Sequence, residues 1–141
     1  VIFCFLCCSL FACQTMPTTF LAEGAPAAIG PYSHGAVCDG MPVFLSGQIA
    51  LDTAGMFLGG SAAEQTTAVF RNIRAVLAAQ GLTLNDVVKT TVYLTNMGDF
   101  QEMNAVYGSE FGDHRPARTT VEVSRLPKDA IVEIEVIACK R

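Results

Sequence analysis

Two stretches of this chain repeat apolar residues at helical spacing, and this pattern constrains the fold more than any other feature of the sequence. The first stretch begins with a capping box, in which Ser61 and Glu64 satisfy free N–H groups of the first turn, and Gly81 supplies its stop. The second opens at Asp99 and ends near Gly112. The apolar stripes are Val69, Ile73, Val76 and Leu77 in the first stretch, and Phe100, Met103, Tyr107 and Phe111 in the second. Each stripe needs an apolar surface to bury it.

Runs rich in Val, Ile and Thr flank both helices and supply that surface. Such residues favour strands, and the Asp39-Gly40 pair between two of these runs is a strong hairpin signal. The expected strands are residues 36–38, 43–50, 87–95, 118–124 and 131–139, and the order leaves room for one more near the N-terminus. This order predicts an α+β fold, a two-layer sandwich in which two helices cover one face of a mixed β-sheet. The uncovered face still carries Val and Ile, so we expect another subunit to bury it.

The first 13 residues differ in composition from the rest of the chain. They contain 12 apolar residues, no charge and four of the six cysteines. A bilayer span needs about 20 apolar residues, whereas a signal peptide needs roughly 7–15 but also a cationic start, which is missing here. Two interpretations stay open: an export signal or lipoprotein box ending at Cys13, or upstream translation before a natural start at Met16. We treat residues 1–15 as an apolar leader outside the fold and residues 16–141 as one domain.

The remaining cysteines, Cys38 and Cys139, lie far apart in the sequence, and nothing in their spacing indicates that they meet. Isolated cysteines in apolar runs are usually buried small hydrophobes in a reducing compartment. We therefore expect two free thiols and a cytoplasmic protein. Cys4 and Cys7 have metal-like spacing without a second pair or a following His, so no metal site is predicted.

The charge balance and the missing motifs exclude several classes of function. The formal net charge is −4, which argues against a basic patch that grips nucleic acid. The glycines between Gly55 and Gly60 lack the Lys and Ser or Thr of a phosphate-binding loop. Only two histidines are present, His34 and His114, and both are expected to be ordinary surface or loop residues.

Arg118 is the first candidate for ligand binding, because it begins an expected strand. A guanidinium binds a carboxylate through two parallel hydrogen bonds, which Lys does not reproduce. The alternative is a plain cross-strand ion pair with Glu122 or Glu133.

Glu133 is the second candidate. It shares a strand face with Glu135, while the alternate residues of this strand are apolar. A carboxylate in such a strand either faces solvent or has its pKa raised by burial for acid–base work. Asn104, one turn after Phe100, is either a boundary residue or reaches a site beside the sheet.

Five spaced motifs together resemble the RidA/YjgF family, the reactive intermediate deaminases. They are APAAIGPYS at 25–33, LSGQI at 45–49, VKTTV at 88–92, RTTVEVSRLPKD at 118–129 and EIEVIA at 133–138. The resemblance extends over residues 22–141 in colinear order and leaves out the leader.

The resemblance implies a chorismate-mutase-like α+β fold and a homotrimer with active sites between subunits. It also implies hydrolysis of 2-imino or enamine acids, such as 2-iminobutanoate and 2-iminopropanoate, to 2-oxo acids and ammonia, without a cofactor. Two alternatives remain: an endoribonuclease or translation inhibitor, which the acidic chain disfavours, and a non-catalytic trimer that binds a small ligand.

The resemblance also assigns roles to individual residues. Arg118 matches the residue that binds the substrate carboxylate, and Glu133 matches the acid that positions or activates water. The matching pocket residues are Tyr32, Ser46, Gly47, Asn104 and Thr120. Some members have Cys where Thr120 stands, so a thiol role is excluded here. The segment 112–118 is also shorter than in the bacterial deaminase and carries Arg115 in place of an apolar residue, which bears on substrate preference.

Overall fold

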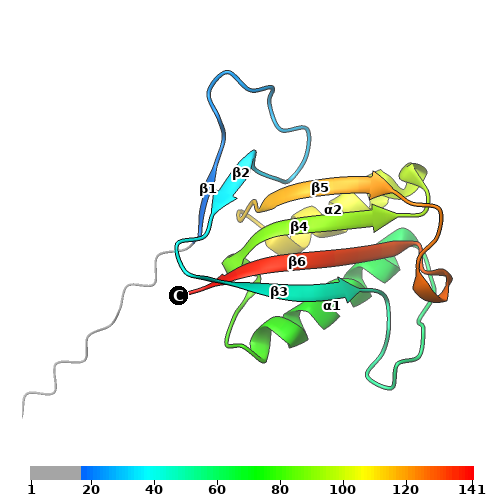
Figure 1. Ribbon diagram of the computed structural model, residues 1–141. Coiled ribbons are helices and arrows are strands. Elements are labelled where there is room, and N and C mark those ends of the chain that lie inside the picture. The colour runs from blue at the N-terminus through cyan, green and yellow to red at the C-terminus, as the bar shows by residue number, and fades with distance from the viewer. Residues whose placement is uncertain (1–16) are drawn as a thin grey trace, which may run out of the picture.

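The computed structural model describes residues 17–141, and the leader predicted at residues 1–15 lies outside these described residues (Figure 1). Its strands and helices are β1 (Thr18–Phe20), β2 (Gly35–Val37), β3 (Met41–Gln48), α1 (Ala62–Ala78), β4 (Val87–Leu94), α2 (Phe100–Phe111), β5 (Ala117–Glu122) and β6 (Val132–Lys140). The main sheet has the order β3-β6-β4-β5, with β4 parallel to β5 and the other pairs antiparallel. Both helices lie on one face of this sheet (Figure 1). The predicted α+β sandwich with a mixed sheet is confirmed.

Helix α1 begins and ends where the sequence predicts. The Ser61 backbone N–H donates to the Glu64 carboxylate at 2.8 Å, and the Glu64 N–H donates to the Ser61 hydroxyl at 3.3 Å. The helix ends at Ala78, and Gly81 follows in the left-handed region with φ of 71°. These contacts satisfy backbone groups that the first turn leaves without partners.

The core lies between the helices and the covered face of the sheet. Phe70 of α1 packs edge-on against Tyr107 and Phe111 of α2, at ring-centre distances of 5.7 and 5.4 Å. Along β6 the residues alternate as predicted: Val132, Ile134 and Val136 are buried, whereas Glu133, Glu135 and Ile137 are only partly buried. The two faces of this strand therefore have separate roles, one in the core and one on the open side of the sheet.

The hairpin predicted at Asp39-Gly40 is wrong. Strand β2 pairs with β1, and β3 pairs with β6, so the chain passes from one sheet to another across this turn. Residues 17–37 form an arm that projects from the body (Figure 1). Pairing with distant strands replaced the local hairpin because β6 offers a long apolar partner for β3.

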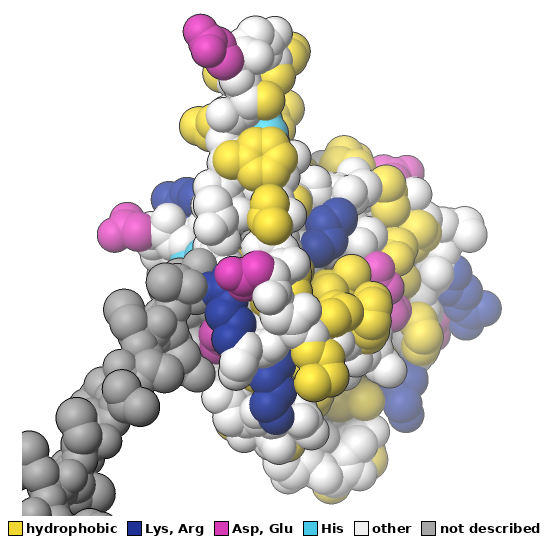
Figure 2. Space-filling view, turned by 60° about the vertical axis from the view of Figure 1, so that its left-hand side comes forward, with side chains coloured by type: hydrophobic (Ala, Val, Ile, Leu, Met, Phe, Trp, Pro, Cys, Tyr) yellow, Lys and Arg dark blue, Asp and Glu magenta, His cyan; other side chains and the backbone are white. Residues whose placement is uncertain are grey.

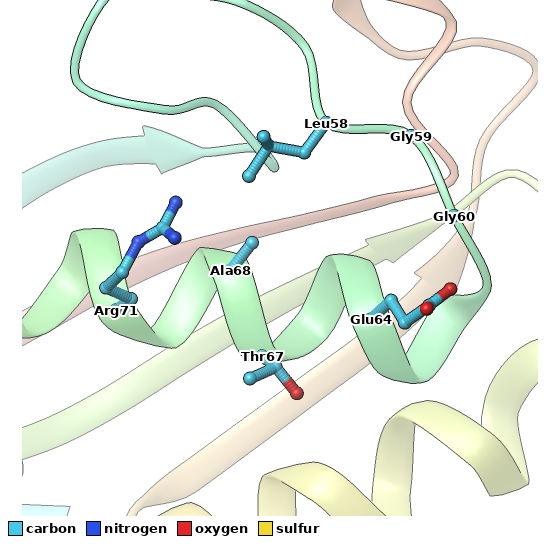
Figure 3. A pocket seen from close by; sticks show the side chains of 7 residues that line it. All are labelled: Leu58, Gly59, Gly60, Glu64, Thr67, Ala68 and Arg71. Atoms are coloured by element: carbon cyan, nitrogen blue, oxygen red, sulfur yellow. The ribbon is translucent and has the colours of Figure 1, made fainter.

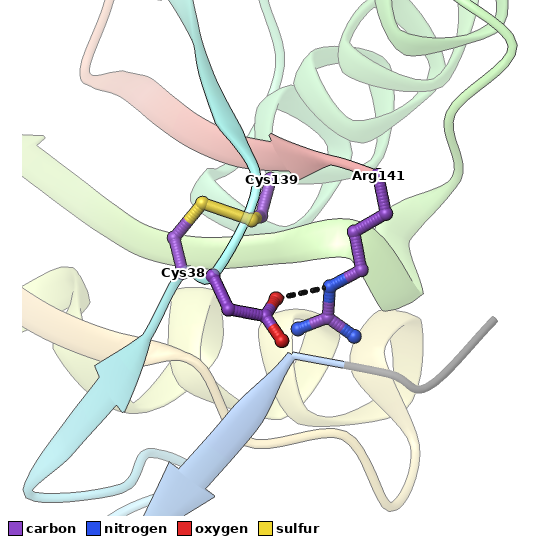
Figure 4. Close-up of a disulfide and its surroundings, with 4 residues drawn as sticks. Cys38, Cys139 and Arg141 are labelled. Atoms are coloured by element: carbon purple, nitrogen blue, oxygen red, sulfur yellow. Dashed lines mark ion pairs between the residues drawn. A yellow bond between two sulfur atoms is a disulfide. The ribbon is translucent and has the colours of Figure 1, made fainter.

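Cys38 and Cys139 form a disulfide, which contradicts the prediction of two free thiols. Their Cα atoms lie 5.5 Å apart, although 101 residues separate them in sequence. Beside the bond, Arg141 pairs with Asp39 at 2.6 Å between Nε and Oδ1 (Figure 4). The disulfide and this ion pair fasten the base of the arm to the end of β6. The reducing compartment expected from these cysteines stays a prediction.

The open face of the sheet carries apolar side chains, as expected. Phe44 is 74% exposed and Val121 is 38% exposed, and Ile137 lies opposite Phe44 in the β3–β6 register. Figure 2 shows further hydrophobic side chains along the arm, where Phe20, Leu21 and Ile29 are exposed. Within residues 17–141, no helix has the length and apolar character that crossing a membrane requires.

Candidate active site

The Arg118 side chain lies among three aromatic rings beside α2. Its Nη1 donates to the Asn104 Oδ1 at 2.8 Å, and its guanidinium carbon lies 4.6 Å from the ring centre of Tyr107. The rings of Tyr32 and Phe100 lie 5.2 and 5.6 Å away. Cation–π contacts of this kind stabilise a charged guanidinium and also fix its orientation. The side chain is therefore held in place before any ligand binds.

Tyr107 supports Arg118 from within the core. Its hydroxyl lies 2.8 Å from the Thr90 hydroxyl, and burial raises the pKa of Tyr107 to about 12. The phenol consequently stays neutral at physiological pH and offers its ring face to the guanidinium. Burial also lowers the pKa of Arg118 from its usual value. Because a guanidinium is so strongly basic to begin with, Arg118 still remains charged.

A cavity of about 200 Å³ opens next to Arg118, lined by Ile29, Tyr32, Phe100, Arg118 and Thr120. The Thr120 Oγ1 is the buried side-chain oxygen or nitrogen that has no hydrogen-bond partner among the described residues. A buried polar atom without a partner costs free energy unless something satisfies it. Gly30 permits this arrangement, because a Cβ there would lie 2.8 Å from the Arg118 Nη2. The cavity thus combines one fixed cation with one unsatisfied hydroxyl.

The alternative interpretation of Arg118, an ion pair with Glu122 or Glu133, does not describe this structure. The Glu122 carboxylate instead accepts from the Met97 N–H at 2.6 Å. Glu133 lies on the other side of the sheet, opposite Tyr93 in the register of β4 and β6. Within the described chain, the polar side-chain partner of Arg118 is Asn104.

Glu133 lies against the backbone of β3. A Cβ on Gly47 would overlap the Glu133 carboxylate, so the glycine is what allows the two strands' groups to meet. The β3–β6 register shifts between Leu45 and Gln48, and Ser46 lies exposed in this irregular stretch. Burial, and then the charge of Glu135, raise the pKa of Glu133 above its usual value.

The predicted site residues form two groups on opposite faces of the sheet. Arg118 pairs with Thr90, which contacts α2 through Tyr107, so Arg118 lies on the helix side. Glu133 pairs with Tyr93 of β4, which lies three residues after Thr90 on that strand. Because side chains alternate between the two faces of a sheet, Tyr93 and Glu133 lie on the open side. We name the first group the arginine half (Tyr32, Asn104, Arg118 and Thr120) and the second the glutamate half (Ser46, Gly47 and Glu133). One copy of the chain does not bring the two halves together.

A larger cavity, of about 310 Å³, lies beside the N-terminal part of α1, between Leu58 and Arg71 (Figure 3). Its charged groups already serve the fold: Glu64 caps the helix, and the Arg71 Nη2 donates to the Leu51 carbonyl at 3.0 Å. It contains none of the predicted site residues.

The histidines and the short segment before β5 also have structural partners. The His34 Nδ1 accepts from the Ala22 N–H at 2.9 Å, and the His114 Nε2 lies 2.7 Å from the Val87 carbonyl oxygen. Arg115 donates to the Gly112 carbonyl. None of the three lines the cavity at Arg118.

Sequence reasoning missed three residues that shape the arginine half. The sequence places Phe100 and Tyr107 only in the apolar stripe of their helix, and Ile29 only in an extended segment. The spacing that places Asn104 one turn from Phe100 and Tyr107 was the available signal, because residues three and four apart share a helix face.

These features define a two-layer α+β protein with a small arginine-lined pocket at the edge of its sheet, and comparison with known proteins identifies the family. The model of the family described as Endoribonuclease L-PSP matches residues 22–140. The chain belongs to this family, which confirms the resemblance to the RidA/YjgF proteins.

The relatives agree over nearly their whole length. A RutC family protein of Pyrococcus horikoshii is 50% identical over 126 residues, 89% of this chain and 99% of the relative. The 2-iminobutanoate/2-iminopropanoate deaminase of Salmonella typhimurium is 43% identical over 129 residues, 89% of this chain and all of the relative. The crystal structure of E. coli TdcF with bound serine is 38% identical and covers 88% of this chain and 99% of its own, with a TM-score of 0.67.

Proposed function

We propose that this protein hydrolyses 2-imino acids, such as 2-iminobutanoate and 2-iminopropanoate, to 2-oxo acids and ammonia. The observation that carries the proposal is the fixed Arg118 guanidinium beside the unpartnered Thr120 hydroxyl in a small cavity. The name of the deaminase relative states that it acts on 2-imino acids. TdcF was crystallised with serine, a small 2-amino acid that carries the same carboxylate group.

Arg118 binds the substrate carboxylate in this proposal. Its Nη1 donates to Asn104, and the Arg118 side chain lines the cavity that a ligand would enter. Two parallel N–H···O bonds would fix both the position and the plane of the acid group. The Thr120 hydroxyl gains its missing hydrogen-bond partner from the same ligand. It takes the place of the family's cysteine without contributing a thiol.

Glu133 handles the proton. Its raised pKa makes the carboxylate a stronger base than an exposed glutamate. It accepts a proton from water as the oxygen attacks the imine carbon, and returns the proton to nitrogen. The resulting carbinolamine then collapses to the 2-oxo acid and ammonia. Because an imine is already electrophilic, orientation and one proton-handling group suffice.

The active site is shared between subunits in this proposal. The arginine half and the glutamate half lie on opposite faces of one sheet, so a second copy has to bring its glutamate half to the first copy's cavity. The exposed Phe44 and Val121 on the open face give such a copy an apolar surface to bury. A homotrimer with three equivalent sites closes this head-to-tail contact.

The test is a coupled assay in which threonine dehydratase releases the imine from threonine. We expect added protein to accelerate the release of ammonia and 2-oxobutanoate, and Arg118→Ala to lower kcat/KM about a thousandfold, as loss of a buried charge partner does. The control is Arg74→Ala, which removes the contacts of Arg74 with the carboxylate and the backbone carbonyl of Glu110, at 2.6 and 3.4 Å, away from the cavity.

An Arg118→Ala variant as active as wild type would contradict the proposal. So would tight binding of 2-oxo acids without any imine turnover, which points to a ligand-binding trimer. RNA cleavage that survives purification and disappears in Arg118→Ala would instead support the endoribonuclease alternative.

A further inference from the structure

Glu133 has a neighbouring strand on each side, and the two neighbours differ in bulk. On the β3 side lies Gly47, which carries no side chain and against whose backbone the Glu133 carboxylate lies. On the β4 side lies Tyr93, directly opposite Glu133 in the β4–β6 register. The Cβ atoms of side chains that face each other in this way lie about 5 Å apart. The Tyr93 ring therefore takes up space over β4 that the Glu133 side chain would otherwise share.

The Tyr93 ring is anchored where it lies. It packs against a small apolar cluster that is separate from the main core and consists of Ile49, Leu126 and Ala130. Packing an aromatic ring against apolar side chains is favourable, and turning the ring toward water would lose that contact. The ring is thus fixed beside Glu133 instead of being free to make room for it.

The Tyr93 hydroxyl acts on the second carboxylate of β6. Burial raises the pKa of Tyr93, and the charges of Glu135 and Glu133 and a hydrogen bond to Glu135 raise it further, whereas a hydrogen bond with Thr91 lowers it. The phenol stays protonated as a result and can donate to Glu135. The Glu135 Oε1 also accepts from the Thr91 hydroxyl at 2.9 Å. Glu135 is therefore engaged within the subunit, whereas Glu133 is the carboxylate that lies against the Gly47 backbone.

We infer that Tyr93 is a positioning residue that, together with Gly47, directs the Glu133 carboxylate to the β3 side of the sheet. The inference rests on the proposed function, in which Glu133 handles the proton. The bulky residue closes one side and the glycine opens the other, so rotamers of Glu133 that point over β4 are disfavoured. A proton-handling group has to lie within a narrow range of positions relative to the reacting atoms. Tyr93 supplies this restriction by acting through Glu133.

The titratable groups that share the open face with Glu133 come from two strands. Strand β6 contributes Glu135, and β4 contributes Tyr93 and Lys89, whose Nζ donates to the Thr119 hydroxyl at 3.0 Å. Strand β3 contributes none, because its sequence MPVFLSGQ contains no titratable side chain. Removing the Tyr93 side chain therefore opens Glu133 to water without removing a charge. This should lower the pKa of Glu133, since burial is the first cause of its raised value.

The experiment compares Tyr93→Ala with Tyr93→Phe, which keeps the ring and loses only the hydroxyl. We expect Tyr93→Ala to lower kcat for 2-iminobutanoate about tenfold, to change KM by less than about twofold, and to move the acid limb of the pH profile to lower pH. Tyr93→Phe should recover most of the wild-type kcat and the wild-type acid limb. The control for a loss of packing alone is Val123→Ala, because Val123 packs against the same apolar cluster. An unchanged kcat and acid limb in Tyr93→Ala would overturn the inference and leave the proposed function standing.

Combining Tyr93→Ala with Gly47→Ala tests whether the two residues act on the same side chain. Each change alone should lower kcat about tenfold, because small misplacements of a reacting group are costly. The double variant should lose little more than either single variant, since the direction of Glu133 is already lost in each of them. Losses that multiply to about a hundredfold would show independent effects and would overturn the joint role of the two residues.

NMR titration of the glutamate carboxyl carbons separates failure of the positioning from failure of the chemistry. The Glu133 signal, assigned by its absence from Glu133→Gln, should titrate at lower pH in Tyr93→Ala than in wild type and near the wild-type pH in Tyr93→Phe. This result would support the positioning role even if no imine were turned over, and the proposed function alone would then fail. A Glu133 titration that Tyr93→Ala leaves unchanged would overturn the inference whatever the activity.

Discussion

The arginine half and the glutamate half of the candidate site differ in how much of their geometry one subunit supplies. Arg118 is held by Asn104 and by the rings of Tyr107, Tyr32 and Phe100, all within the same chain. Glu133 lies against the Gly47 backbone on the open face of the sheet. One subunit therefore orients Arg118 by itself, whereas in our proposal a second copy brings Glu133 to the cavity.

Replacing Glu133 with Gln should have the largest effect and should fall on the chemical step. The amide keeps the shape of the side chain but accepts no proton, so kcat should drop about a thousandfold while KM changes little. Steady-state kinetics on imine substrates measure both values, with Glu110→Gln, away from the cavity at Arg118, as the control. A large rise in KM with unchanged kcat would contradict the assignment of Glu133 to the chemical step.

The pH dependence of kcat should follow the same carboxylate. Its pKa is raised by burial and by Glu135, so protonation should remove activity at a higher pH than for an exposed glutamate. Glu135→Gln removes the second cause, lowers the pKa of Glu133 and should move the acid limb of the profile to lower pH. An acid limb that does not move in this variant would show that Glu135 has no part in it.

Arg118→Lys should have the next largest effect and should fall on binding. Lys keeps the positive charge but loses the planar fork and the stacking on three rings, so KM should rise about a hundredfold. Calorimetry with a 2-oxo acid checks the same loss without chemistry. Equal affinity in Arg118→Lys and wild type would mean that charge alone, rather than the fixed geometry of the arginine half, binds the acid.

Two glycine substitutions test the arginine half and the glutamate half separately, and their expected kinetic effects are smaller. A Cβ at Gly30 would crowd the Arg118 guanidinium, and one at Gly47 would displace the Glu133 carboxylate. We expect about a tenfold loss from each, in KM for Gly30→Ala and in kcat for Gly47→Ala, because small misplacements of reacting groups are costly. Gly108→Ala is the control, since its Cβ would make ordinary contact with Pro31 at 3.5 Å. Identical kinetic effects from both variants would contradict the division of roles.

Loss of the disulfide should have the smallest effect on catalysis and a clear effect on stability. Cys38 directly follows the arm that carries Tyr32, and Cys139 lies on the strand that carries Glu133. Opening a loop of 101 residues should lower the free energy of unfolding by about 4 kcal/mol.

Without this bond the arm pays an ordering cost on ligand binding, so KM should rise about fivefold. Urea titration and kinetics of a Cys38→Ala/Cys139→Ala variant measure both effects. Wild type treated with reductant should behave like the variant. A free energy of unfolding that neither change lowers would contradict a stabilising role of the disulfide.

The sequence predicted those parts of the molecule that depend on local spacing. Helix α1 follows from the capping residues Ser61 and Glu64, and the alternation along β6 follows from strand geometry. The motif resemblance also named Arg118 and Glu133 as candidates, whose roles stay proposals.

The features that the sequence did not predict depend on long-range pairing. The Asp39-Gly40 turn has the local chemistry of a hairpin, but β3 gains more by pairing with β6. The disulfide joins Cys38 and Cys139, which are 101 residues apart, and no local sequence pattern indicates that these two cysteines meet. The sequence indicates only a core position for Tyr107, because an apolar stripe does not reveal that one ring face supports a cation.

The central claim, that each site combines halves from two subunits, is tested most directly by mixing two inactive variants. Arg118→Ala and Glu133→Gln chains, co-expressed with different tags and purified as mixed trimers, should recover about a third of wild-type kcat/KM per site. This fraction follows because a ring of two chains of one kind and one of the other has a single interface out of three that joins an intact Arg118 to an intact Glu133. Light scattering confirms the assembly, and each variant mixed with itself is the control. Activity no greater than that of the separate variants would contradict the claim and place the whole site within one chain.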